Sequence, residues 1–185
     1  MYEYTAKSVN QLKEDLSSSD DSVISKALIK TRAKGNEQLI SPLIDLYLKT
    51  ENNKIREEIK NIFSELKNKE IIDFLIPILS EWANEVKELI LFSIWSSGID
   101  MTDHIPILIE ASCSGNFMVI LEALTVLENL EGPFNEDDLF QANTLLQQYL
   151  YEAEDGKEKE LIQSMYDIVL EFGEKYWKLL KIYLF

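Results

Sequence analysis

The sequence predicts an all-α fold built from about five antiparallel helix pairs. The chain has 6 glycines and 4 prolines among 185 residues, about 5% together against roughly 12% in average proteins. That is too few for the closely spaced turns of an all-β fold. Strand-like alternation of apolar and polar residues is nowhere sustained, whereas helical spacing of apolar residues recurs along the chain.

A repeat of 31 to 33 residues sets the period of these helices. Four segments begin with a small polar residue and then place two apolar residues four positions apart. The first apolar residues of these segments are separated by 32, 31 and 33 residues, and they are Val23, Ile55, Val86 and Val119. Because a fixed period of this length is typical of helical repeat arrays, we expect one stacked array.

A second helical pattern precedes each of the later segments, with apolar residues at i, i+3, i+4 and i+7. The predicted pairs, in chain order, are 8–17 with 20–34, 36–50 with 52–67, 69–81 with 84–97, 102–113 with 116–131, and 135–152 with 157–173. Residues 174–185 remain as an amphipathic tail. No linker is long enough to divide the chain, so we expect a single domain over 1–185.

Glycine and asparagine mark the ends of these helices. Five of the six glycines fall just after a periodic segment, where a left-handed C-cap is expected: Gly35, Gly98, Gly115, Gly132 and Gly173. Small polar residues stand where N-caps are expected, at Asn36, Asn68, Thr102, Asn116 and Asn135. The spacing of apolar residues and the positions of the cap residues therefore predict the same helices.

The repeated segments resemble the HEAT-repeat family, whose units pair an A helix, often containing proline, with a B helix that begins D-x-x-V-[RK]. Pro42 and Pro106 both stand 13 residues before the first aliphatic residue of the next B helix. Arg56 and Lys87 match the basic position of the family pattern. Pro77 stands one helical turn away from the expected proline.

The resemblance covers about residues 8–173. It implies a HEAT-like solenoid, a right-handed α-α superhelix in which the B helices line the concave face and bind partners there. We therefore asked which residues the B helices would present on that face.

Two neighbouring B helices, 84–97 and 116–131, are apolar almost all round. With 100° per residue, the sides opposite the core hold large apolar residues in both helices. Such helices must be covered on every side. We expect a partner-binding patch there, unless solenoid curvature or the C-terminal tail covers it. Its residues are Leu91, Trp95, Phe117, Leu121 and Leu124.

Charge limits the kinds of partner. The chain has 33 acidic and 18 basic residues, a net charge of −15. We expect no nucleic-acid partner, because binding to phosphates rests on lysine and arginine, whereas a basic protein fits this charge. Acidic residues concentrated in 131–160 are expected to form a rim beside the patch, namely Glu131, Glu136, Asp137, Asp138, Glu152, Glu154 and Asp155.

Catalytic and metal-binding motifs are scarce. One histidine and one cysteine cannot assemble a Cys/His zinc site, and no glycine-rich phosphate loop occurs. We therefore expect no cofactor, no metal and no catalysis. The single cysteine, the absence of a signal peptide and the absence of a long apolar run predict a cytoplasmic protein without a membrane segment.

These observations favour a non-catalytic interaction module that binds another protein on its B-helix face, as a monomer or homodimer. An alternative is an acidic inhibitor or immunity-type protein that neutralises a basic partner, which requires carboxylates clustered on one face. A further, less favoured alternative that the resemblance implies is a HEAT-like enzyme such as a DNA glycosylase or a bilin lyase. The net charge opposes the cationic groove of a glycosylase.

Overall fold

The computed structural model describes the backbone of residues 6–34, 37–66 and 71–184, and side chains up to Glu174. Within these residues the protein is all-helical, as predicted. Short 3₁₀ turns precede two helices, η1 (Glu37–Leu39) and η3 (Thr102–His104). The α-helices are α1 (Ala6–Leu16), α2 (Asp21–Lys34), α3 (Ile40–Lys49), α4 (Asn53–Ser64), α5 (Ile72–Glu81), α6 (Asn84–Ser97), α7 (Ile105–Cys113), α8 (Phe117–Glu128), α9 (Glu136–Glu152) and α10 (Lys157–Leu184).

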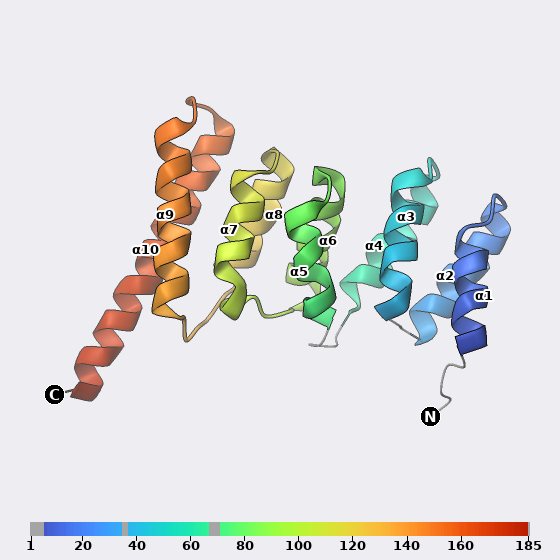
Figure 1. The fold of residues 1–185 in the computed structure, drawn as a ribbon, viewed down its shortest axis with the longest axis horizontal. Helices are drawn as coiled ribbons and strands as arrows, with labels where there is room; N and C mark the ends of the chain where they lie inside the picture. The colour runs from blue at the N-terminus through green and yellow to red at the C-terminus, as the bar shows by residue number, and fades with distance from the viewer. Residues whose placement is uncertain (1–5, 35–36, 67–70, 185) are drawn as a thin grey trace.

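The helices form antiparallel pairs that follow one another in two rows (Figure 1). The A helices, with odd numbers, make the front row, and the B helices, with even numbers, lie behind them. Each B helix packs against the next B helix, from α2 through α10. This arrangement confirms the predicted all-α helical-repeat architecture. The right-handed superhelix stays a prediction.

The repeat seen in the sequence builds the core. The second apolar residue of each repeated segment is fully buried, namely Ala27, Ile59, Ile90 and Ala123. The first apolar residue is also buried in α4, α6 and α8. In α2, by contrast, Val23 is half-buried and Ile24 is buried in its place. The first repeat therefore departs from the prediction at this position, whereas Ala27 is buried as predicted.

Polar caps hold several helix ends as predicted. The side chain of Asn116 accepts a hydrogen bond from the backbone N–H of Val119, and Asn135 accepts from Asp137 and Asp138. Gly98 ends α6 in the left-handed conformation, with φ of 71°. The predicted caps Gly35, Asn36 and Asn68 and the predicted helix starts at 36 and 69 lie outside the described residues.

The last helix differs from the prediction. Gly173 does not end α10, a helix of 28 residues that continues past this glycine to Leu184. A single glycine costs a helix interior only about 1 kcal/mol relative to alanine, and helix-forming residues follow it. The predicted tail is therefore an extension of α10 that runs away from the other pairs and does not fold back over α6 and α8 (Figure 1).

None of the described helices, α10 included, combines the length and the apolar character that crossing a membrane requires. The tail side chains and Phe185 lie outside the described residues.

Candidate partner-binding surface

Each B helix buries a row of its side chains against the neighbouring B helix. Leu91 in α6 is 0% exposed and Leu124 in α8 is 8% exposed. Each stands five residues after the first apolar residue of its repeat, about 140° around the helix from the core-facing direction. Because each B helix packs against the B helices on both sides, this direction is covered. The prediction of Leu91 and Leu124 as partner-binding anchors is wrong, since both belong to the core.

Trp95 is the most exposed member of the predicted patch, at 39%. It stands nine residues after Val86, about 180° from the core-facing direction. Its ring meets Phe92 edge to face, with centroids 5.3 Å apart. Its indole Nε1–H donates a hydrogen bond of 2.5 Å to Oε2 of Glu122 on α8. The ring is thus held in one orientation while part of its surface faces solvent.

Other large apolar residues of α8 are also partly exposed. Phe117 and Leu121 are half-buried. Met118, which the sequence analysis did not select, is 42% exposed and lies one turn before Glu122 on the same stripe of the helix. Periodicity assigns a residue to a face of its own helix, but it gives no alignment between neighbouring helices. The Trp95–Glu122 pair could not be found from it.

A hollow of about 370 Å³ lies beside Trp95, where α6 and α8 end. The C-cap residues of both helices line it, and helix C-termini carry partial negative charge. The carboxylates of Asp100 and Glu131 also line it, and none of its lining residues is lysine or arginine. Oδ1 of Asp100 accepts hydrogen bonds from the N–H and the hydroxyl of Thr102, at 2.9 and 2.6 Å. Two acidic residues and two helix C-termini therefore border this hollow.

The net charge is concentrated in the same part of the chain. Residues 88–156 contain 13 acidic residues and no lysine or arginine, whereas the remaining 116 residues contain 20 acidic and 18 basic residues. The segment spans most of α6 and all of α7, α8 and α9. Nearly the whole net charge of −15 therefore belongs to the half of the array that presents Trp95.

The predicted acidic rim is divided between the two ends of α9. Glu136, Asp137 and Asp138 lie in the first turn of this 17-residue helix, where the helix dipole favours carboxylates. The other group, Glu152, Glu154 and Asp155, lies about 25 Å away, at the turn into α10 (Figure 1). Only Glu131 of the predicted rim lines the hollow beside Trp95. The seven predicted rim residues therefore do not form a single group beside Trp95.

Cys113 lines a separate hollow beside the second acidic group. Burial raises the pKa of the Cys113 thiol to about 11, which keeps it protonated at neutral pH. Among the described residues, no group of three or more histidine, cysteine, aspartate or glutamate side chains is placed to hold a metal ion.

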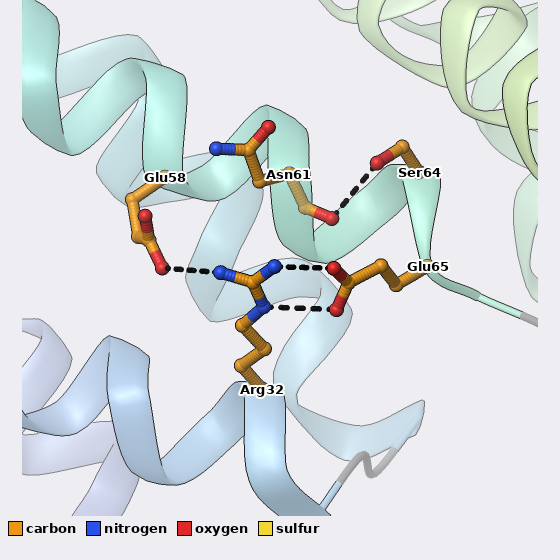
Figure 2. A network of polar contacts seen from close by, with 5 residues as sticks. All are labelled: Arg32, Glu58, Asn61, Ser64 and Glu65. Carbon is orange, nitrogen blue, oxygen red and sulfur yellow. Dashed lines mark hydrogen bonds and ion pairs between the residues drawn. The ribbon is translucent and has the colours of Figure 1, made fainter.

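Basic residues of three B helices form bonds with residues of the next repeat. Arg56, at the basic position of the HEAT pattern, donates a 2.5 Å hydrogen bond to Glu85, and Lys87 donates one of 3.0 Å to Ser114. Arg32 on α2 donates through Nε to Glu65 at 2.9 Å and through Nη2 to the same carboxylate (Figure 2). These cations stabilise the array internally.

Comparison with known proteins gives no family or relative: no family model matches the chain, and no curated protein matches it. The resemblance to HEAT repeats therefore stays a prediction, and the functional argument rests on the geometry described above.

Proposed function

We propose that this protein is a non-catalytic interaction module that binds a basic protein partner around Trp95. The observation that carries the proposal is an exposed tryptophan held in place by Glu122, in a helix whose other residues are buried or half-buried. Tryptophan is enriched among the residues that contribute most to protein–protein binding. Its ring offers a large apolar contact area at a small cost in side-chain entropy.

The charge distribution supports a basic partner. A lysine or arginine side chain entering the hollow would stack on the Trp95 ring, an arrangement that attracts cations to the aromatic face. The carboxylates of Asp100 and Glu131 and the two helix ends would stabilise the same charge. A nucleic acid would be repelled by the 13 carboxylates of residues 88–156.

Self-association through this surface is disfavoured. In a two-fold dimer each copy presents the same surface to the other. Residues 88–156, with a net charge of −13, would therefore face the same residues of the second copy. Like charges placed opposite each other in an interface cost affinity. A second protein, rather than a second copy, is the partner that we propose for this surface.

The acidic inhibitor remains the second candidate. The concentration of charge in residues 88–156 supports a basic target. Mimicry of nucleic acid requires carboxylates on one face, however, and the two acidic groups lie at opposite ends of α9. A glycosylase-like enzyme would need cations along its groove, which this segment lacks. The interaction module therefore fits the surface better.

The test begins with basic peptides and then uses the natural partner. Proteins retained by the wild type are purified, and each is titrated by calorimetry against the wild type and Trp95→Ala. We expect Trp95→Ala to raise Kd by about 30-fold or more, corresponding to at least 2 kcal/mol. The matched control is Phe140→Ala, because Phe140 is 73% exposed on α9, outside this surface.

The stability of Trp95→Ala decides whether the binding result is interpretable. We expect the variant to unfold only about 1–2 kcal/mol more easily than the wild type, because part of the ring is already in solvent. A loss of about 3–5 kcal/mol would make Trp95 a core residue and overturn the proposal. Equal partner affinity for the wild type and Trp95→Ala would do the same.

A further inference from the structure

The tail of the chain, residues 174–185, is rich in large apolar residues. Eight of its twelve residues are apolar or aromatic, and the other four are three lysines and one glutamate. A helix with so much apolar surface is normally buried against another surface. The backbone of α10 carries the tail past the end of α9 and away from the other helix pairs (Figure 1). These pairs are therefore not placed to cover it.

The outward face of α9 is an exposed stripe without charge. Four exposed residues stand four, three and four positions apart and so share one side of the helix, namely Phe140, Thr144, Gln147 and Tyr151. Phe140 is 73% exposed and Tyr151 is 92% exposed. From Leu139 to Tyr151 the sequence contains no charged residue. Aromatic residues without neighbouring charges are typical of the centre of a protein–protein interface.

Carboxylates lie at both ends of this outward face. The two acidic groups described above stand at the start of α9 and at its turn into α10. A second α9 laid against the face would bring carboxylates next to carboxylates in either direction, and like charges placed opposite each other cost affinity. The charge pattern therefore favours an occupant that is both apolar and basic.

The tail has this composition. Its three lysines and one glutamate give a net charge of +2, whereas residues 88–156 carry −13. As a helix the tail spans about 18 Å, and Phe140 and Tyr151 are about 16 Å apart along α9. We propose that the tail of a second copy lies along the outward face of α9. In a two-fold dimer this contact forms twice, because each copy supplies one tail and one α9.

This dimer does not use the surface around Trp95. The outward face belongs to an A helix, whereas Trp95 lies on a B helix, in the other row of the array (Figure 1). The competing occupant for an apolar, basic tail is an anionic membrane surface. Such a surface repels residues 88–156 of the same molecule, and this repulsion favours the second copy.

Sedimentation equilibrium of the full chain at several concentrations measures the self-association. We expect a monomer–dimer equilibrium that weakens as salt is added, because opposite charges meet in the contact. Reversing the three tail lysines, with Lys175→Glu, Lys178→Glu and Lys181→Glu, should raise the dissociation constant about tenfold or more. The matched control makes the same change in charge at three exposed lysines of the first repeat and should leave the constant unchanged: Lys7→Glu, Lys26→Glu and Lys30→Glu.

The other side of the contact is tested on α9. Phe140→Ala combined with Tyr151→Ala should also raise the dissociation constant about tenfold or more. Both side chains are largely in solvent, so the variant should fold like the wild type. Trp95→Ala should leave the self-association unchanged. The failure of this proposal is therefore distinguishable from the failure of the proposed function.

Mixing the two kinds of variant tests the exchange of tails. The lysine variant keeps an intact α9 and the aromatic variant keeps an intact tail, so a mixed pair restores one of the two contacts. We expect the mixture to associate more tightly than either variant alone, and no gain on mixing would overturn the contact between tail and α9. A wild type that stays monomeric, or that binds phosphatidylserine-containing vesicles in place of forming dimers, would overturn the second copy as the occupant.

Discussion

The indole of Trp95 on α6 donates its N–H to Glu122 on α8 across a distance of 2.5 Å. This single contact joins two repeats and fixes the orientation of the most exposed residue of the predicted patch. A hydrogen bond to a charged acceptor is stronger than a neutral one, although partial exposure reduces its contribution.

Replacing Glu122 tests this bond. We expect Glu122→Ala to lower the free energy of unfolding by about 0.5–1.5 kcal/mol. Glu122→Gln should lower it less, because its amide oxygen still accepts the indole N–H. Urea unfolding measures both effects. Glu128→Ala, an exposed acidic residue of the same helix, is the control, and an equal loss in that variant would contradict the assignment.

The buried stripe between B helices gives a second prediction. Leu91→Ala and Leu124→Ala should each cost about 2–5 kcal/mol, because they leave cavities in the core. Trp95→Ala should cost clearly less than either substitution. The three variants are compared by denaturant unfolding under the same conditions. If Leu91→Ala lowered the free energy of unfolding no more than Trp95→Ala, Leu91 would not be a core residue.

The two glycines of contrasting conformation give a third prediction. Gly173 lies within α10, and a Cβ atom there would meet nothing within 4 Å. Gly173→Ala should therefore stabilise the protein by about 0.5–1 kcal/mol. Gly98 has a φ of +71°, and Gly98→Ala should destabilise it by about 1–2 kcal/mol. A loss of stability in Gly173→Ala would show that the helix ends at this residue.

Alkaline pH provides a fourth prediction. Burial raises the pKa of the Cys113 thiol from 9.0 to about 11, so the folded protein retains this proton more tightly than the unfolded chain. Stability from this group is complete below pH 9 and is lost as the pH rises toward 11. After allowance for partial exposure, the loss is about 1–2 kcal/mol.

The control for this experiment is Cys113→Ala, whose stability should change less over the same pH interval. Unfolding by urea at pH 8 and pH 11 measures the difference. Parallel loss in both proteins would show that other groups cause the alkaline destabilisation and that the thiol is not the buried group involved.

Most of the fold could be predicted from the sequence because its determinants are local. The burial of Ile59 and Ile90 follows from helical periodicity, and the N-caps at Asn116 and Asn135 follow from residue type. The end of α10 could not be predicted in this way. Glycine only weakens a helix, so its position alone does not decide between a cap and an interior residue.

The candidate surface was predicted only in part, because it depends on contacts between repeats. A helical wheel separates the core side of α6 from the opposite side, but it does not show that Leu91 lies under the neighbouring helix. For the same reason, the cross-helix partners of Trp95 and Arg32 became known only from the structure. The two residues of each pair are 27 and 33 positions apart in the sequence. Such a separation does not reveal which side chains meet across neighbouring helices.

The uneven placement of charge along the array has a kinetic consequence. With the net charge gathered in residues 88–156, the molecule has an electric dipole along its long axis. The basic partner that we propose would be turned by this field during diffusion and would first meet the half formed by α6 to α9. Added salt should therefore slow association, whereas loss of the Trp95 ring should mainly speed dissociation. The rate at which a complex forms and its lifetime are thus set by different residues of the same surface.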